Sequence, residues 1–552
     1  MLPSKNGTIN PFLLSISSAL LLIAAWPVSP FTPLIFVAWV PLLKLSYQEN
    51  KIRFFLFAIL TMFIWNVGTT WWIWNSTAAG AIGAIIANSF LMTLPLWGYH
   101  IIKSRFGNAV GLVSFIAFWL SFEYIHLNWQ LSWPWLTLGN VFATNPNWVQ
   151  WYEYTGTSGG SLWVLLVNVL VFKIIQHRMN STTTSISNAQ STSNKNMVSR
   201  QIIGVILLLV IPFAASYLIK AKLTSNDELL KTANNNVVIV QPNIDPYNEK
   251  FIAGNTDAII QKMINLSESR VDSNTRLVIW PETALPVAVW QDRVLENLYY
   301  QPVAQFVNNH PRLTLLTGIE TFKNYGHDKA TITARFNEND ETYYDGFNAA
   351  IAIKAGHPLQ FYNKSKLVPG VETLPDFLLW LGPIFEKFGG TAGGYGKDKE
   401  SAVFKVEGNP YVAAPIICYE SIYGEYIASY VRKGANLLTI ITNDGWWGNT
   451  PGHKQHLNYA RLHAIETRRW IARSANTGIS AIIDDKGALL HTEPWDKAAV
   501  IKYNIPTMER HTFFVEHGDV LSPLALLLTV LLFIWNVVTI IKKRMRLKQR
   551  TL

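Results

Sequence analysis

Eight runs of apolar residues, each close to the length of a bilayer crossing, dominate this sequence. They lie at 11–28, 31–47, 54–74, 79–102, 109–127, 159–176, 202–219 and 521–541. A helix needs about 20 mostly apolar residues to cross the hydrocarbon of a bilayer. We therefore expect an α-helical membrane bundle with eight transmembrane helices. The first run has no small-residue cleavage site and leads directly into the second run, so we expect it to be an anchor.

The charges that flank these runs predict the orientation of the bundle. The N-terminal tail, the loops 44–53, 103–108 and 173–201 and the C-terminal tail hold 16 of the 46 basic residues but one of the 36 acidic residues. Basic flanks gather on the cytoplasmic side of membrane proteins. Eight crossings with a cytoplasmic N-terminus place all these basic segments inside and the tryptophan-rich loops outside.

The net charge of +10 belongs to these membrane flanks. The rest of the chain holds 30 basic and 35 acidic residues, which is a mildly acidic balance. It has no basic stripe of the kind that nucleic-acid binding needs, so we expect no nucleic-acid partner.

The long segment between the last two apolar runs predicts a separate domain. We expect helices 1–7 within 1–220, an extracytoplasmic domain at 221–520, and an eighth helix with a basic cytoplasmic tail at 521–552. Apolar strand-like stretches alternate with polar helical ones in that domain, which favours an α/β layer fold. The expected strands are 237–241, 276–280, 313–319, 348–354, 411–418, 435–442 and 478–484, and the expected helices are 254–269 and 455–472. The polar, low-complexity segment 180–199 is expected to be a loop.

The chain has a single cysteine, Cys418, which excludes an internal disulfide. Cys418 ends the apolar run 411–418, and a helix-like stretch follows it. A thiol at this point would lie at the rim of the sheet, near helix N–H groups that stabilise a thiolate. A small buried residue that ends a strand would explain the local sequence equally well.

Other polar side chains could also take part in chemistry. Glu282 could act as a general base, although an acid that caps a turn is the commoner role there. Lys364 and Lys366 would share one face of an extended segment, and either lysine could stabilise an oxyanion. The loop that contains Asn443 and Trp446 could close over an apolar ligand, or it could be an ordinary turn packed by aromatic residues.

In combination, these segments resemble a known group of enzymes. The motifs WPE (280–282), YNKSKLVP (362–369), ICYE (417–420) and NDGWWG (443–448) resemble the carbon–nitrogen hydrolase, or nitrilase, superfamily. The eight-crossing frame, with a domain inserted before the last helix, is similar to the apolipoprotein N-acyltransferase family, as is the segment 133–139. This resemblance implies that the α/β domain is a nitrilase-like αββα sandwich.

The resemblance also implies roles for individual residues. Glu282 is the expected base, Lys364 the oxyanion stabiliser and Cys418 the nucleophile, since Lys364 rather than Lys366 matches the family pattern Tyr-x-Lys-x-x-Leu-Val-Pro. The expected supporting or substrate-binding residues are Glu372, Tyr419, Glu420, Asn443 and Trp446. The family's tryptophan after the first strand has no counterpart here, and Tyr247 or Phe251 is expected to replace it.

The implied activity is acyl transfer in the bacterial cytoplasmic (inner) membrane. The expected acyl donor is a phospholipid, and the expected acceptor is the α-amino group of a lipoprotein's diacylglyceryl-cysteine. No cofactor or metal is expected, and the histidines lack the H-E-x-x-H type of spacing. The alternatives are a membrane-tethered amidase or nitrilase that hydrolyses a small amide, and a catalytically dead binding domain on a transporter or sensor.

Overall fold

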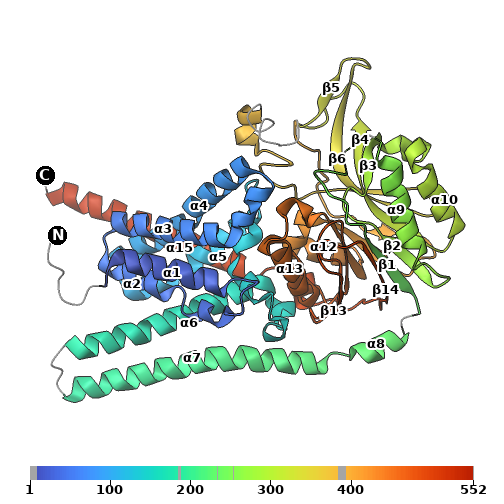
Figure 1. Ribbon diagram of the computed structural model, residues 1–552. Helices are drawn as coiled ribbons and strands as arrows, with labels where there is room; N and C mark the ends of the chain where they lie inside the picture. Colours follow the sequence, from blue (N-terminus) through green and yellow to red (C-terminus); the bar gives the residue numbers. More distant parts are fainter. Residues whose placement is uncertain are drawn as a thin grey trace.

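The computed structural model describes residues 9–183, 188–232, 234–250, 252, 254–382 and 393–550. A bundle of long helices lies against an α/β domain (Figure 1). The chain forms most of the bundle first, then the α/β domain, and then returns to the bundle in its last helix. Both termini therefore lie at the end of the bundle that points away from the α/β domain (Figure 1).

The bundle is built from helices that run to and fro between these two ends. They are α1 (Pro11–Ala25), α2 (Val40–Gln48), α3 (Lys51–Thr70), α4 (Ala78–Phe106), α5 (Asn108–Leu127), α6 (Tyr152–Thr183), α7 (Asn188–Lys222) and α15 (Leu521–Arg550). Short 3₁₀ helices connect them: η1 (Thr32–Phe36), η2 (Trp71–Asn75), η3 (Pro134–Leu136), η4 (Leu138–Phe142) and η5 (Pro146–Trp148). Among the described residues, six helices are long and apolar enough to cross a membrane, namely α3 to α7 and α15, whereas α1 is apolar but shorter.

The second apolar run, 31–47, does not form the single helix expected for it. It forms η1 and α2, and a proline lies in the first turn of each. Proline starts a helix readily there because its missing N–H would have no helical partner. The buried side chain of Asn168 accepts a hydrogen bond from Trp39 N (2.9 Å) and donates one to Ile35 O (2.8 Å). One amide from α6 therefore satisfies the backbone groups that this break exposes.

The segment 180–199, expected to be a loop, is largely helical. Helix α6 continues to Thr183 and α7 begins at Asn188, while residues 184–187 lie outside the described residues. An α-helix satisfies its backbone hydrogen bonds locally, so it can continue beyond a bundle without burying side chains in a core. Polar composition alone was therefore a poor guide to the backbone here.

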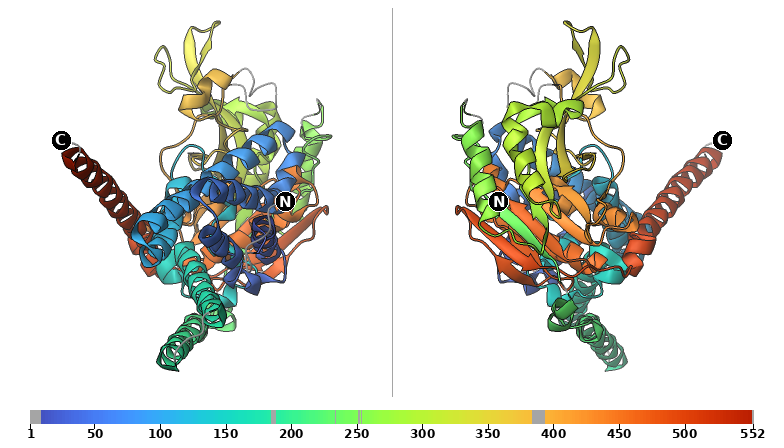
Figure 2. Two further views of the ribbon diagram at one scale, coloured as in Figure 1. Left: turned by 90° about the vertical axis from the view of Figure 1, so that its left-hand side faces the viewer. Right: turned by 90° about the vertical axis from the view of Figure 1, so that its right-hand side faces the viewer.

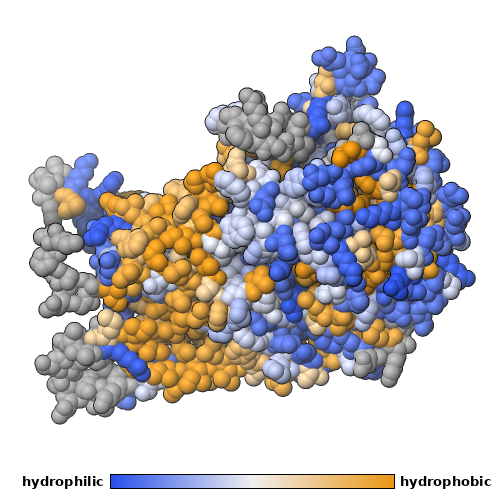
Figure 3. Space-filling view, in the orientation of Figure 1, coloured by the Kyte–Doolittle hydropathy of each residue, from blue (hydrophilic) through white to orange (hydrophobic). Residues whose placement is uncertain are grey.

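Helices α7 and α15 present apolar surface to the outside. In the most apolar stretch of each helix, 6% of the α7 residues and 11% of the α15 residues are buried. Both helices project away from the others when the bundle is viewed from its end (Figure 2). An apolar band covers the helices, and the α/β domain beyond it is mostly hydrophilic (Figure 3). Apolar helices of this length and exposure fit a lipid environment and not water.

The α/β domain contains two sheets. The first has the order β14-β1-β2-β4-β6-β5, with β3 on β4 and β7 on β6, and the second has the order β13-β12-β11-β10-β9-β8. The first sheet consists of β1 (Asn236–Gln241), β2 (Thr275–Ile279), β3 (Leu285–Trp290), β4 (Thr314–Asn324), β5 (Arg335–Asn337), β6 (Thr342–Ile353), β7 (Gln360–Asn363) and β14 (Ala499–Asn504). The second consists of β8 (Phe404–Lys405), β9 (Val412–Ile417), β10 (Leu437–Thr442), β11 (Ile471–Ala475), β12 (Ala481–Ile483) and β13 (Leu489–Thr492). Strands β1, β2 and β4 are parallel, as are β9, β10 and β11.

Four layers result from the alternation of side chains along these strands. Ile239 and Ile279 of the first sheet pack with Ile416 and Ile440 of the second, so the two inner faces form one core. Alternate residues point outward, where helices α9 (Thr256–Glu268) and α10 (Gln301–Asn309) cover the first sheet. Helices α12 (Gly424–Arg432) and α13 (Pro451–Thr467) cover the second sheet and face the bundle (Figure 1). The observed αββα sandwich matches the expected fold of this domain.

The helix predicted at 455–472 ends earlier in the structure. Helix α13 stops at Thr467, Arg468 adopts a left-handed conformation (φ 50°), and β11 begins at Ile471. A left-handed residue is a common helix terminator. The expected strand 478–484 is also shorter, since β12 covers only Ala481–Ile483. The other expected strands coincide with β1, β2, β4, β6, β9 and β10 to within a few residues, apart from N- or C-terminal extensions of β4 and β6.

Candidate active site

Three of the predicted residues converge where strands end between the two sheets. Glu282 follows β2, Lys364 follows β7, and Cys418 follows β9 of the second sheet. The Lys364 Nζ atom lies 3.3 Å from Glu282 Oε1. The side chain of Cys418 lies within the electrostatic range of both Glu282 and Lys364. All three side chains are buried, with exposed fractions of 6% for Glu282, 1% for Lys364 and 8% for Cys418.

Glu372 completes the charged group. Its Oε1 atom accepts a hydrogen bond from Lys364 Nζ (2.8 Å), and its Oε2 atom accepts one from the backbone N–H of Val368 (2.8 Å). Burial alone would lower the pKa of Lys364, but Glu372 and then Glu282 act in the opposite direction, and the pKa lies above its usual value. Lys364 is therefore a permanent cation held between two carboxylates.

Two asparagines fix the position of the Glu282 carboxylate. Asn348, on β6, donates its side-chain N–H to Glu282 Oε1 (2.8 Å) and to Glu372 Oε1 (3.1 Å). The backbone N–H of Asn443 donates to Glu282 Oε2 (3.1 Å). The prediction of Asn443 as a site residue thus corresponds to a backbone contact. Asn348 was not predicted, since it lies inside an apolar strand and no motif marks it.

The strand-to-turn segment at Glu282 depends on a close backbone approach. Gly318, on β4, lies directly against it: a Cβ atom at Gly318 would lie 2.4 Å from Thr283 N and 2.7 Å from Glu282 Cα. Both distances are shorter than real Cβ contacts, so a side chain at Gly318 would force the backbone to shift. Thr283 itself has a positive φ of 45°. The absence of a side chain at Gly318 therefore allows the Glu282 carboxylate to turn toward Lys364.

Cys418 occupies a strained turn. It is the first residue of η9 (Cys418–Ile422) and has a φ of 49°, a conformation that non-glycine residues adopt rarely. Burial raises the pKa of its thiol, Glu282 raises this pKa further, and Lys364 lowers it. The net effect is a rise, so the resting thiol is neutral. The cysteine therefore needs a base to form the reactive thiolate.

A buried network of polar side chains holds the turn at Cys418 through its backbone carbonyl group. Ser421 Oγ donates to Cys418 O (2.7 Å), and His456 Nε2 lies 2.7 Å from Ser421 Oγ and 3.2 Å from Cys418 O. On the other side of its ring, His456 Nδ1 lies 2.9 Å from Asp444 Oδ1, and Arg473 donates to Asp444 Oδ2 (2.8 Å). Burial would raise the pKa of Asp444, but Arg473 and His456 hold it well below its usual range. Of these four side chains, the sequence motifs pointed only to Asp444, which lies in the segment 443–448.

Glu420 is a clamp between segments. Its Oε1 atom accepts hydrogen bonds from Tyr362 OH (2.5 Å) and Ser365 N (2.7 Å), and its Oε2 atom accepts one from Ile417 N (2.9 Å). Burial raises the pKa of Glu420. The contacts join the turn that carries Lys364 to the turn that carries Cys418, so Glu420 positions the two turns relative to each other.

Tyr419 contacts the bundle, whereas Trp446 contacts another residue of the α/β domain. Tyr419 donates its OH group to Ser132 O (2.9 Å), and Trp446 O accepts a hydrogen bond from Tyr247 OH (3.2 Å). The Tyr247 and Trp446 rings meet edge to face at 5.1 Å. Tyr247 thus lies next to the predicted loop, and its replacement of the family's tryptophan stays a prediction. The other candidate, Phe251, lies outside the described residues.

Lys366 is separate from the charged group. Its Nζ atom lies over the rings of Tyr423 (5.3 Å) and Tyr426 (5.5 Å), and Lys364 alone of the two lysines contacts Glu282 and Glu372. The structure therefore distinguishes two lysines that the extended segment left equivalent.

Comparison with known proteins accounts for both parts of this architecture. Residues 18–170 match the family described as apolipoprotein N-acyltransferase N-terminal domain, and residues 236–510 match carbon–nitrogen hydrolase. An apolipoprotein N-acyltransferase of Chlorobaculum tepidum is 30% identical over 533 residues, which cover 94% of this chain and 95% of that protein. This chain belongs to the apolipoprotein N-acyltransferase family.

Another member of the family, from Geobacter metallireducens, is 24% identical over 527 residues, which cover 93% of this chain and 92% of that protein. Among solved structures, Saccharomyces cerevisiae Nit3, a member of branch 10 of the nitrilase superfamily, has a TM-score of 0.35 and 15% identity. That similarity covers 49% of this chain and 90% of Nit3. In the N-acyltransferase chain, the first family match spans most of the bundle, and the second begins with β1 and ends just after β14.

The two parts of this N-acyltransferase family member are joined through buried contacts. Arg468 forms a buried ion pair with Glu153 of α6 (2.7 Å) and donates to Gln150 Oε1 (2.7 Å). Near the active site, the Trp447 ring lies 4.8 Å from Trp72 and 5.6 Å from Trp135, measured between ring centroids. The loop after β10 thus packs directly on the aromatic residues of the bundle.

Proposed function

We propose that this chain transfers a fatty acyl group from a phospholipid, through a thioester on Cys418, to the α-amino group of the N-terminal diacylglyceryl-cysteine of lipoproteins. Its membership of the apolipoprotein N-acyltransferase family supports this activity. The observation that carries the proposal is the position of Cys418. The thiol lies beside a carboxylate and a buried ammonium, in a domain whose neighbouring loop packs on an apolar helical bundle.

In the first half-reaction, Glu282 removes the proton from the Cys418 thiol as the sulfur attacks the ester carbonyl of the phospholipid. The Lys364 ammonium is poised to stabilise the oxyanion of the tetrahedral intermediate. When the intermediate collapses, the C–O bond of the ester breaks. The lysophospholipid alkoxide takes the proton from Glu282 and leaves, and the acyl group remains on Cys418 as a thioester.

In the second half-reaction, the neutral α-amino group of the lipoprotein attacks the thioester. Glu282 accepts a proton from the attacking nitrogen, and Lys364 again stabilises the oxyanion. The C–S bond breaks, the amide is released, and the Cys418 thiolate regains a proton from Glu282. Glu372 and Asn348 keep Lys364 and Glu282 in place through both steps.

We also propose an orientation: eight segments cross the bacterial cytoplasmic membrane, both termini are cytoplasmic, and the domain at about 221–520 is periplasmic. Lys103, near the end of α4, donates to Ser46 O of α2, and Arg105 contacts Asn536 of α15. The basic ends of these helices therefore gather away from the α/β domain. At the opposite end, Trp26 donates to Tyr459 of the domain (3.1 Å). This arrangement agrees with the positive-inside rule.

Mass spectrometry of the purified protein tests acyl transfer against hydrolysis. Phospholipid alone is expected to add one acyl chain to Cys418, to release one lysophospholipid per protein, and then to stall. A peptide with an S-diacylglyceryl N-terminal cysteine is expected to discharge the thioester, and blocking its α-amino group is expected to prevent this. Continuous release of fatty acid at the same rate with and without the peptide would instead identify a hydrolase.

A further inference from the structure

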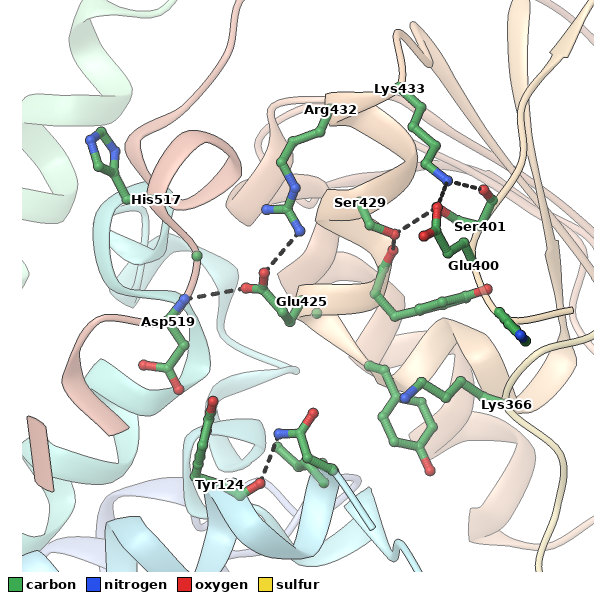
Figure 4. Close-up of a pocket in the computed structure, with 17 residues that line it drawn as sticks. Tyr124, Lys366, Glu400, Ser401, Glu425, Ser429, Arg432, Lys433, His517 and Asp519 are labelled. Atoms are coloured by element: carbon green, nitrogen blue, oxygen red, sulfur yellow. Dashed lines mark hydrogen bonds and ion pairs between the residues drawn. The ribbon is translucent and has the colours of Figure 1, made fainter. Parts of the chain in front are cut away.

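A cavity of about 510 Å³ lies where the bundle meets the α/β domain (Figure 4). One wall comes from the last turn of α5, including Tyr124, and from residues 517–519, just before α15 begins. The opposite wall comes from α12, residues 399–401 and Lys366. The ends of α5 and α15 mark the level at which apolar helices give way to the hydrophilic domain, which is the level of lipid headgroups in a membrane.

Several charges in the cavity are already neutralised. Arg432 forms an ion pair with Glu425 (2.9 Å), and Lys433 forms one with Glu400 (2.8 Å), both visible in Figure 4. The third carboxylate, Asp519, accepts hydrogen bonds from Ser158 Oγ (2.8 Å) and from Ser522 N (3.1 Å). The latter N–H belongs to the first turn of α15, where a helix favours a negative charge.

Two lysines of the cavity have no such partner. Within the described part of the chain, neither Lys366 nor Lys399 forms an ion pair, and Lys366 lies over the rings of Tyr423 and Tyr426. Burial is the main cause that lowers the pKa of Lys366. The Glu420 carboxylate acts in the opposite direction, and the positive charge of Lys397 lowers the pKa further. A concave site with unpaired ammonium groups of the same sign creates a positive potential that favours an anion.

We propose that this cavity binds the phosphate group of a phospholipid headgroup, with Lys366 and Lys399 as the two cationic contacts. The inference rests on the proposed function, since that function brings phospholipid to this edge of the domain. It adds a subsite: Lys366 lies two residues after Lys364, and Tyr423 lies five residues after Cys418, so the cavity borders both catalytic turns. A lipid is favoured over free phosphate because Tyr124 and Leu127, at the end of an apolar helix, form part of one wall.

A dialkyl ether analogue of phosphatidylglycerol provides the test, because it carries the phosphate but has no ester that could acylate Cys418. Its binding to the full-length protein in neutral detergent is measured by native mass spectrometry. A Lys366→Gln/Lys399→Gln double variant is expected to lose on the order of tenfold in affinity, as for the loss of charge-assisted hydrogen bonds. Lys405→Gln, which removes an exposed lysine outside the cavity, is the matched charge control and is expected to bind as the wild type does. A Lys366→Arg/Lys399→Arg variant keeps both charges and is expected to retain binding.

Three results would overturn the inference: wild-type affinity in the glutamine double variant, equal binding of a dialkylglycerol that lacks the phosphate, or displacement of the ether lipid by low millimolar inorganic phosphate. The last result would identify a free-phosphate site. Acylation of Cys418 by ester phospholipid, measured on the same wild-type preparation, keeps the two proposals apart. If Cys418 is acylated while the glutamine double variant binds the ether lipid normally, the subsite is wrong and the transfer activity stands.

Discussion

At the scale of single residues, the site is a group of charged side chains in which each charge lies next to one of opposite sign. Lys364 lies between Glu282 and Glu372, and Asn348 bridges the two carboxylates. Buried charges are tolerated only when they are paired and hydrogen-bonded, so removing one member leaves its partners uncompensated. The neutral thiol of Cys418 is the exception, because it becomes charged only when it reacts.

Substitutions at these residues are expected to lower the rate at which Cys418 is acylated. Glu282→Gln keeps the size of the side chain but removes the base, so we expect acylation of Cys418 to fall by about 10²- to 10⁴-fold. Lys364→Ala removes the oxyanion stabiliser and is expected to cost at least about 10²-fold. The rate of acyl adduct formation by mass spectrometry is the measurement, and Lys405→Ala serves as the control. Acylation at the wild-type rate in Lys364→Ala would assign the oxyanion to other donors.

The raised pKa of the Cys418 thiol predicts how its reactivity changes with pH. An ordinary cysteine has a pKa of about 8.5, so a thiol with a higher pKa forms less thiolate than an ordinary cysteine at the same pH. Alkylation of Cys418 by iodoacetamide should therefore still increase above pH 9. Because Lys364 lowers this pKa, Lys364→Ala should shift the increase to still higher pH. The protein has one cysteine, so alkylation mapped to Cys418 by peptide mass spectrometry reports this thiol. A plateau below pH 8 would contradict the predicted pKa direction.

The sequence indicated Glu282 and Cys418 because each follows an expected strand, and the motifs that resemble the family indicated Lys364 and Glu372. The sequence did not indicate Asn348 and His456, and the reason is physical. Their partners are separated from them by 66 and 38 residues along the chain, and the contacts depend on strand pairing and on the packing of α13, which no local pattern encodes.

At the scale of elements, the turn between β9 and η9 is where the fold prepares the nucleophile. Its positive φ costs on the order of 1–3 kcal/mol, which the surrounding structure must offset. Ser421 and His456 both contact the carbonyl of Cys418, and Asp444 with Arg473 holds the imidazole. Within the described part of the chain, no hydrogen bond joins these residues to the thiol, so we regard them as positioning residues.

Loss of His456 is therefore expected to affect rate more than substrate affinity. We expect His456→Ala to lower kcat by about tenfold or more with little change in KM, and His456→Gln to restore part of the rate by replacing one hydrogen bond. The alkylation rate of Cys418 at pH 8 gives a second measurement that does not depend on lipid binding. A variant with lower thermal stability but unchanged kcat would show that the network is purely structural.

Helix and strand boundaries were less predictable than their order along the chain. The apolar pattern located the strands of the central core, because parallel strands covered on both faces are continuously apolar. It missed the end of α13, because Arg468 terminates the helix in a conformation supported by Glu153 and Gln150 of the bundle. It also missed the break between η1 and α2, which Asn168 stabilises from another helix.

At the scale of the whole molecule, the membrane topology is a testable prediction. A reporter that is active only outside the cytoplasm should be active when fused after Lys222 and inactive when fused after Arg200. Arg200 precedes the apolar run 202–219 of α7, and Lys222 follows it. The inverse pattern at either position would contradict the eight-segment arrangement. A cytoplasmic reporter with reciprocal activity serves as the control.

The exposed flanks of α7 and α15 have a kinetic meaning. An enzyme held in a lipid phase by such helices meets its lipid substrates by diffusion in two dimensions, so the quantity that governs encounter is the number of substrate molecules per unit of surface. Diluting the acyl donor with an inert lipid should therefore slow the reaction even when its bulk concentration is constant. Conversely, adding more vesicles of the same composition should change the turnover of each bound enzyme very little.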